Sequence, residues 1–350
     1  MHVEDRLSNR RSATLSIRPL HALLRDRNVT SVAADHRTDP SNFGPMGEND
    51  AVDKWAAWLL HRRDGDDPEQ RQKGQEFLLP LRERVLDNAQ IQPGEVVLDV
   101  GAGDGLIAFG ALDRVGAQGH VIVSDVSDDL VSHARSLATE RGAAGRMSFV
   151  RAAAEDLSAI ADASVDVVTT RSVLIYVDDK AAAFRAFHRV LKPGGRLSIF
   201  EPINNYFPLS PDEFWGFEAG SVRDLVAKVC EYEGWVESSF ASDPMMNFTE
   251  KDLLRCAEDA GFRDVHVELL VDVEPGTEVV DWERMLNTSP NPNARTVGEA
   301  LRGALSDEEL ARFEKHVRPL ADAGEGTLRL ACTYLRAMKA SERSPRRSPR

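Results

Sequence analysis

Apolar runs alternate with amphipathic segments through the middle of the chain. Short apolar runs predict buried strands, and stretches with apolar residues three and four positions apart predict helices that cover a sheet. The predicted strands are 95–100, 120–126, 147–152, 165–171 and 195–201, and the predicted helices between them are 105–115, 128–141 and 179–191. This order indicates a parallel sheet that is built through right-handed crossovers.

The regular alternation stops after Pro202. Residues 203–247 are rich in aromatic side chains, and one or two helices are expected around 211–233. The later elements are a helix at 250–260 capped by Thr249, a strand at 265–273, a helix from the capping box at Ser306 to about 321, and a last strand at 326–338. The two last strands bring the predicted total to seven.

The segment before the first strand predicts two helices between about 50 and 90. The second runs from about Asp67 to Leu86, with a break or kink near Pro80, because proline removes a helical hydrogen bond. Residues 1–45 and the basic tail at 340–350 lack periodicity, so we expect both to be disordered.

Composition limits the classes of partner. The formal net charge is −14 over 350 residues, which argues against a nucleic-acid backbone or an anionic membrane as the main partner. No apolar run approaches the roughly 20 residues of a membrane span. The three cysteines are widely spaced, so we expect free thiols, a cytoplasmic location and no metal site.

A glycine-rich turn follows the first predicted strand. Residues 96–105 read Val-Val-Leu-Asp-Val-Gly-Ala-Gly-Asp-Gly, so Gly101, Gly103 and Gly105 are two positions apart. A dinucleotide-binding turn has its third glycine three places after the second, and Leu106 stands there instead. The spacing therefore disfavours a nicotinamide-dependent dehydrogenase.

Two acidic residues accompany this turn. Asp99 precedes it by two positions, where a carboxylate would repel a pyrophosphate and attract a cationic group. Asp125 closes the next predicted strand, where a carboxylate offers two acceptor oxygens to the hydroxyls of a ribose. The pattern indicates a nucleoside-bearing cofactor that also carries a positive charge.

Further motifs give a resemblance to a known family. Residues 165–202 contain Val-Asp-Val-Val-Thr-Thr-Arg, then Arg-Val-Leu-Lys-Pro-Gly-Gly-Arg-Leu, and Ala260-Gly-Phe-Arg-Asp-Val precedes the sixth strand. Together with the glycine turn they resemble the class I S-adenosylmethionine-dependent methyltransferases, of the small-molecule type found in ubiquinone and menaquinone biosynthesis. The resemblance implies an α/β fold: a Rossmann-like, seven-stranded, mostly parallel sheet with helices on both faces, and helical cap insertions.

The resemblance also implies a division of the chain. The cofactor-binding core is expected at 93–202, with a further core helix and strand at 249–273 and a final core strand at 326–339. The caps are expected at 46–92, 203–248 and 274–325.

S-adenosyl-L-methionine is the cofactor that the resemblance implies, and the family motifs carry roles to particular residues. The backbone of the glycine turn would approach the cofactor, Asp99 would hold its ammonium group, and Asp125 would hold its ribose. The remaining implied contacts are Ala102 in the turn, Val126 on the adenine, Ala154, Glu155 and Asp156 at the adenine edge, and Arg171 at the methionine carboxylate.

Each of these roles has a structural alternative. Asp99 could bond a loop, and Asp125 could cap a helix. Glu155 and Asp156 could be a solvated helix start, and Arg171 could belong to a structural ion pair. A protein that binds the cofactor without catalysing transfer is the alternative to an enzyme.

Methyl transfer to a small organic acceptor, at an O, N or C nucleophile, is the implied reaction. It is an in-line displacement whose leaving group is a neutral thioether, so alignment and exclusion of water supply most of the catalysis. A base is needed only for a poorly ionised hydroxyl or a protonated amine. The candidates for this base are Glu201, Tyr176 and His61. Glu201 could instead be a structural carboxylate that locks a turn, and His61 could instead be an exposed helix residue.

The aromatic residues of the insertions suit a flat, partly apolar acceptor. Their alternative is that Trp215, Trp235 and Trp282 fill the core of the cap itself. A homo-oligomer is compatible with the sequence.

Overall fold

The computed structural model describes residues 52–207, 210–276 and 279–341, so the predicted tail at 1–45 and nearly all of that at 340–350 lie outside the described residues. A seven-stranded sheet forms the centre, in the order β3-β2-β1-β4-β5-β9-β8. The strands are β1 (Val96–Val100), β2 (His120–Asp125), β3 (Met147–Arg151), β4 (Val165–Arg171), β5 (Leu191–Pro202), β8 (Phe262–Gly276) and β9 (Gly326–Lys339). The first five are parallel, and β9 runs antiparallel to both β5 and β8. The predicted α/β sheet of seven mostly parallel strands is confirmed.

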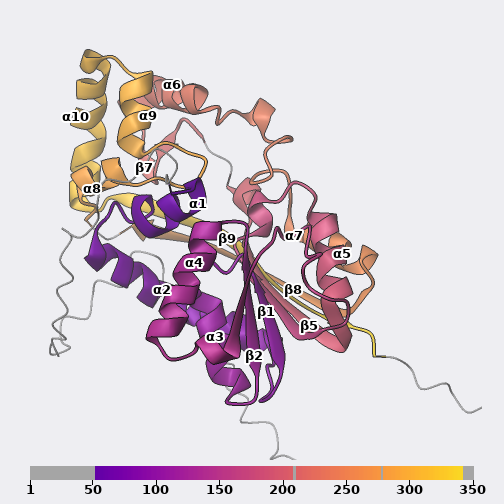
Figure 1. Ribbon diagram of the computed structural model, residues 1–350. Coiled ribbons are helices and arrows are strands. Elements are labelled where there is room, and N and C mark those ends of the chain that lie inside the picture. Colours follow the sequence, from indigo (N-terminus) through magenta and orange to yellow (C-terminus); the bar gives the residue numbers. More distant parts are fainter. Residues whose placement is uncertain (1–51, 208–209, 277–278, 342–350) are drawn as a thin grey trace, which may run out of the picture.

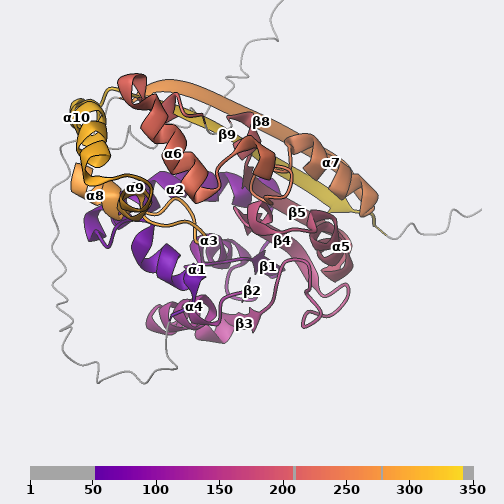
Figure 2. The same ribbon diagram turned by 90° about the horizontal axis from the view of Figure 1, so that it is seen from above.

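Helices cover both faces of the sheet (Figure 2). One face carries α2 (Pro68–Ala89), α3 (Leu106–Val115) and α4 (Asp128–Glu140), and the other carries α5 (Lys180–Val190) and α7 (Glu250–Asp259). The central strands are buried on both sides, which explains why their sequences are continuous apolar runs rather than alternating ones.

A helical cap lies above the carboxyl ends of the parallel strands, at the upper left of Figure 1. It combines the hairpin β6–β7 (Glu213–Phe214, Phe217–Glu218), α6 (Arg223–Glu233), α8 (Trp282–Asn287), α9 (Val297–Ala304) and α10 (Asp307–Ala323). These elements come from both predicted insertions, and they share one hydrophobic cluster around Phe313 and Trp282. The structure therefore has one cap with its own core, and Trp282 fills that core.

Two helix predictions were wrong in detail. A single helix, α2, runs through Pro80, so the helix is not broken there, although a break was one of the two outcomes that we expected, the other being a kink. Pro80 and Glu76, whose carbonyl loses its partner, are both exposed, so water can satisfy the freed oxygen. Near 213–218 a hairpin replaces the start of the expected helix, because Trp215 and Gly216 both adopt positive φ, as the tightest hairpin turns require.

Short turns complete the connections. They are the single-turn helices η4 (Ala144–Arg146), η5 (Leu174–Tyr176), η6 (Asn204–Tyr206), η7 (Gly220–Val222) and η8 (Glu237–Ser239). Within the described residues, no helix combines the length and apolar character needed to cross a bilayer.

The first described helices, α1 (Lys54–Ala57) and the π-helical turn η3 (Trp58–Arg62), follow each other without a gap. We call residues 53–63 the N-terminal cover. Ala56 and Leu59 of the cover form a small apolar cluster with Leu130 at the start of α4. This contact places the cover over the carboxyl end of β2.

Candidate functional site

The glycine turn connects β1 to α3 in a conformation that suits glycine. Gly101, Gly103 and Gly105 have φ of 64°, 58° and 86°. A Cβ at Gly101 would collide with the side chain of Val173, and one at Gly103 would lie 2.9 Å from Leu59 of the cover. The turn is therefore tightly enclosed, and its backbone lies close to the segments that face it.

Asp125 joins the end of β2 to this turn. Its Oδ2 accepts a hydrogen bond from the Gly103 N–H at 2.9 Å, and its Oδ1 accepts one from Ser127 N–H at 3.0 Å. Burial raises the pKa of the carboxyl, and the charge of Asp53 acts in the same direction. Ser127, rather than Asp125, caps α4, which removes the helix-cap alternative for Asp125.

Asp99 is almost completely buried at the end of β1. Its Oδ1 accepts a hydrogen bond from the Thr169 hydroxyl at 2.8 Å, while its Oδ2 has no partner within the described residues. Burial raises the pKa of Asp99 to about 7, although Thr169 and the charge of Arg171 act against this shift. A buried acceptor without a partner is unusual in a native fold, and a cationic group would satisfy it.

The N-terminal cover is fixed directly beside Asp125. Asp53 accepts hydrogen bonds from the backbone of α1 and from the Ser127 hydroxyl, the latter at 2.6 Å, and its own N–H donates to Asp129 at 2.7 Å. Trp55 packs edge-on against Tyr176, with ring centroids 5.1 Å apart. We did not predict these contacts from the sequence, although Asp53 before an apolar run is a helix-capping signal.

Arg171 lies at the end of β4 and is partly buried. Its guanidinium makes no hydrogen bond or ion pair with any other described residue, so no structural ion pair is seen in that part of the chain. Burial lowers the pKa of the guanidinium, and the charge of Arg63 acts in the same direction, whereas those of Asp104 and Asp99 oppose it. Its role at a cofactor carboxylate stays a prediction.

The residues expected at the adenine follow the carboxyl ends of β2 and β3. Val126 is 42% exposed, which leaves an apolar face available. Ala154 is buried in the core below the sheet edge, so only its backbone could meet a ligand. Glu155 is exposed, and Asp156 bonds the Ser158 N–H at 3.1 Å, a turn contact that lowers the pKa of its carboxyl.

Glu201 is buried at the end of β5 and bonds only backbone. Its Oε1 accepts hydrogen bonds from the N–H groups of Val173 and Leu174, both at 2.9 Å, and its Oε2 accepts one from Ile175 at 3.1 Å. Burial raises its pKa to about 7. The side chain locks the loop that follows β4, which is the alternative stated above, and its complete burial leaves it no open path to an acceptor. This geometry favours that alternative over a role as base, and the role as base stays a prediction.

The other two catalytic candidates differ in their surroundings. Tyr176 is partly buried on η5 beneath Trp55, and burial raises the pKa of its hydroxyl to about 12, so the phenol is neutral at physiological pH. His61 lies on the cover, but its side chain is largely exposed and pairs with Asp66 at 2.8 Å. The cover folds over the site, but the imidazole of His61 lies at the solvent surface. This agrees with the alternative given above, an exposed helix residue.

The sheet, the glycine turn and the two acidic strand ends together define a class I S-adenosylmethionine-dependent methyltransferase. The sequence profile of the ubiE/COQ5 methyltransferase family matches residues 80–272, more than half of the chain. The chain belongs to this family.

Individual relatives agree with this assignment. The ubiquinone/menaquinone biosynthesis C-methyltransferase UbiE of Vibrio parahaemolyticus is 31% identical over 183 residues, which are 51% of this chain and 69% of that protein. UbiE of Idiomarina loihiensis is 38% identical over 181 residues, 52% of this chain and 71% of the relative. The family match ends at residue 272, so α8, α9 and α10 of the cap lie beyond it.

Proposed function

We propose that this protein transfers a methyl group from S-adenosylmethionine to a small, partly apolar organic acceptor in the cytoplasm. The observation that carries the proposal is the buried Oδ2 of Asp99, which has no partner among the described residues and lies beside three glycines with positive φ. An ammonium group of the cofactor would pair with this oxygen, and its ribose hydroxyls could donate to the free lone pairs of Asp125.

Residues around the glycine turn would bind and orient this cofactor. Asp99 would hold its ammonium group, and Val126 would contact its adenine. Asp125 would accept hydrogen bonds from its ribose hydroxyls, because each carboxylate oxygen has a lone pair that is not used by the N–H of Gly103 or Ser127. When bound, the cofactor supplies a methyl group on a positively charged sulfur. The protein then has to align the acceptor with that methyl group and exclude water.

The N-terminal cover supports exclusion of water. Leu59 packs over Gly103, and Trp55 packs on Tyr176, so apolar side chains close the site from above. Glu201 would act as a positioning residue, because it holds the loop whose Val173 faces Gly101.

A hollow beside the end of β5 is our candidate for the acceptor. Its volume is about 690 Å³, and its walls are formed by Asn205, Glu237, Phe240, Ala241, Met246, Asn247, Thr249 and Asp252. Three apolar side chains beside two amides, one hydroxyl and two carboxylates suit a molecule that is partly apolar and carries polar groups able to donate hydrogen bonds. Relatives are named C-methyltransferases of ubiquinone and menaquinone biosynthesis, which is consistent with a flat organic acceptor.

The proposal predicts a direct effect on cofactor affinity. Asp125→Ala removes the acceptor for the ribose and the link to Gly103, so the affinity for S-adenosylhomocysteine should fall at least about 100-fold, the loss expected for two charge-assisted hydrogen bonds. Isothermal titration calorimetry measures the affinity. Asp128→Asn, an exposed carboxylate three residues away, is the matched control and should change little. Equal affinities for wild type and Asp125→Ala would contradict the proposal.

A further inference from the structure

A second hollow lies between the N-terminal cover and the cap, away from the glycine turn. Its volume is about 720 Å³. The ionisable side chains that line it are three arginines, Arg62 from the cover and Arg295 and Arg302 from the cap, with one carboxylate, Glu299. None of these residues belongs to the proposed methyl-transfer site.

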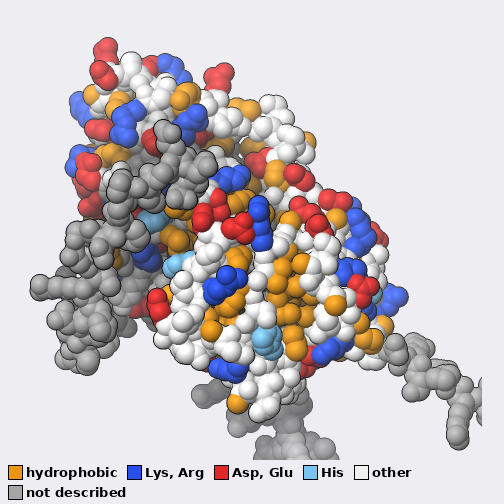
Figure 3. All heavy atoms as spheres, viewed as in Figure 1, with side chains coloured by type: hydrophobic (Ala, Val, Ile, Leu, Met, Phe, Trp, Pro, Cys, Tyr) orange, Lys and Arg blue, Asp and Glu red, His pale blue; other side chains and the backbone are white. Residues whose placement is uncertain are grey.

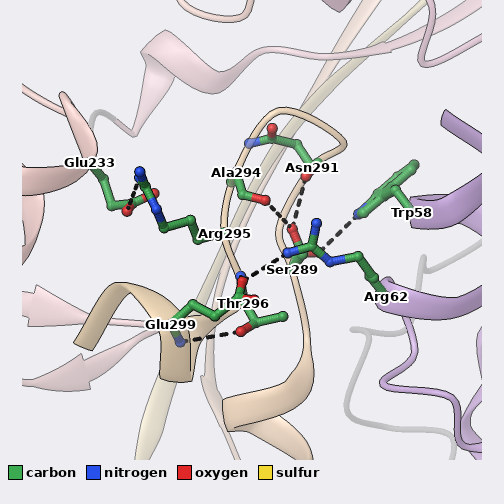
Figure 4. A network of polar contacts seen from close by, with 9 residues as sticks. All are labelled: Trp58, Arg62, Glu233, Ser289, Asn291, Ala294, Arg295, Thr296 and Glu299. Carbon is green, nitrogen blue, oxygen red and sulfur yellow. Dashed lines mark hydrogen bonds and ion pairs between the residues drawn. The ribbon is translucent and has the colours of Figure 1, made fainter. Parts of the chain in front are cut away.

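Figure 4 shows how the cover reaches this region of the cap. Trp58 Nε1–H donates to the carbonyl of Ser289 at 2.9 Å, and the Ser289 N–H donates to the carbonyl of Arg62 at 2.9 Å. Arg62 also pairs with Glu299 at 2.9 Å. The wall of the hollow is thus built by two segments that are far apart in the sequence and joined by one side-chain and one backbone hydrogen bond.

The three guanidinium groups are not equally satisfied. Arg295 pairs with the nearly buried Glu233 at 3.0 Å and stacks over Tyr232 at 4.9 Å from the ring centroid. Arg302 is exposed, and its guanidinium makes no hydrogen bond or ion pair with another described residue. It lies across Gly298, where a Cβ would come within 3.0 Å of its Nη2, so the guanidinium lies close to the backbone of α9.

Charge is in excess here, and it is positive. Lys54 adds a fourth cation at the edge, since its Nζ donates to Asn293 of the lining at 2.7 Å. Four cations thus face two carboxylates, Glu299 and Glu233, in a protein whose net charge is −14. On the part of the cap visible in Figure 3, charged side chains of both signs are interspersed.

We propose that this hollow binds a compact oxyanion with two negative charges, such as a phosphate ester or a dicarboxylate. Arg302 donates to the anion, and Arg62 is shared between the anion and Glu299. Guanidinium groups suit this ligand because their planar donors match carboxylate and phosphate oxygens in pairs. A bound anion bridges the cover and the cap.

Two substitutions test the proposal with opposite signs. Arg302→Gln removes the unpaired guanidinium and should weaken the binding of inorganic phosphate at least about tenfold, the value of one charge-assisted hydrogen bond. Glu299→Gln removes the carboxylate that competes for Arg62, so phosphate should bind several-fold more tightly. Glutamine can still accept from the Thr296 N–H, which Glu299 does now at 2.8 Å, so the start of α9 is retained.

The experiment is a titration of the full chain without S-adenosylmethionine, so its result does not depend on the proposed methyl transfer. Phosphate and succinate are titrated separately by calorimetry at low ionic strength, with sodium chloride at matched ionic strength as the control for screening. Saturation by phosphate alone identifies a phosphate ester as the ligand class, and saturation by succinate alone identifies a dicarboxylate. Arg318→Gln, an exposed arginine of α10 outside the hollow, is the matched control and should bind as wild type. Absence of saturation up to on the order of 10 mM of either anion, or equal binding by Arg302→Gln and wild type, would overturn the proposal.

Discussion

Buried carboxylates are the residues on which the proposed cofactor site depends. Asp99 and Glu201 are both enclosed at the ends of their strands, and burial raises both pKa values to about 7. Their hydrogen bonds differ: Glu201 is satisfied by three backbone N–H groups, whereas Asp99 keeps one oxygen without a partner among the described residues. The first arrangement holds a loop, and the second is suited to a ligand.

The burial of Asp99 predicts a pH-dependent cost in stability. Its pKa is about 7 in the folded protein and 3.8 ordinarily, so between these values the folded state binds more protons than the unfolded state. Its contribution to the free energy of unfolding therefore falls as pH rises from about 4 to 7. Asp99→Asn, which stays neutral, should be more stable than wild type at pH 8 by on the order of 3 kcal/mol, and by little at pH 4.

Urea unfolding at both pH values measures this difference, with the exposed Asp128→Asn as control. Asp99→Asn should also bind S-adenosylhomocysteine more weakly, since its ammonium group loses a charged partner. If Asp99→Asn is no more stable than wild type at pH 8, the burial of the ionised Asp99 carboxylate does not destabilise the folded protein.

At the scale of the element, local signals set most boundaries. Thr249 and Ser306 cap α7 and α10, as we predicted, and the structure adds that the cap at Thr249 is also a capping box. A third box, Thr296 with Glu299, opens α9, and its spacing was equally readable in a segment that we had treated only as an insertion. The glycine turn combines such a local preference with a contact from Val173, in the loop that follows β4.

Comparison of two glycines distinguishes the cost of a positive φ from the cost of a steric clash. Gly101 and Gly142 both have φ of 64°, but a Cβ at Gly101 would collide with Val173, while Gly142 has open space. Gly142→Ala should lower the free energy of unfolding by about 1 kcal/mol, the cost of positive φ in alanine. Gly101→Ala should cost about 2–4 kcal/mol, because overpacking is added, and should also weaken cofactor binding.

Urea unfolding of the two variants checks the first part, and calorimetry with S-adenosylhomocysteine checks the second. The added mutation Val173→Ala should recover part of the stability lost in Gly101→Ala. Equal losses in Gly101→Ala and Gly142→Ala would mean that the loop after β4 shifts freely to admit a methyl group.

At the scale of the whole molecule, the cap is the feature that distant segments create together. Phe313 of α10 is fully buried and packs against Phe214, from the first insertion, with centroids 4.9 Å apart. It also lies 6.5 Å from Trp282, from the second insertion. Neither insertion could bury these rings alone.

Phe313→Ala should therefore loosen both insertions at once. The truncation should cost about 3–5 kcal/mol, the usual loss for a buried phenylalanine. Hydrogen exchange should become faster in α6 and α9 together, although about 70 residues separate them, while α3 keeps its protection. Faster exchange confined to α10 would contradict a shared core.

The sequence by itself determined the order of the strands of the sheet and of the helices between them, the glycine turn, the caps of α7 and α10 and the two acidic strand ends. These features depend on hydrophobic periodicity, on glycine sterics and on hydrogen bonds between residues close in the chain, so they can be read locally. Asp125 and the turn with Gly103 were expected to lie together because parallel strands end at one edge of the sheet.

Only the tertiary structure decided which distant segments meet. It placed the N-terminal cover on Asp125, joined the two insertions into one cap, and enclosed Glu201 among three N–H groups of another loop. It also placed Arg302 beside a hollow shared with the cover. Such contacts depend on the packing of whole surfaces, and the sequence near each residue carries no signal of its partner.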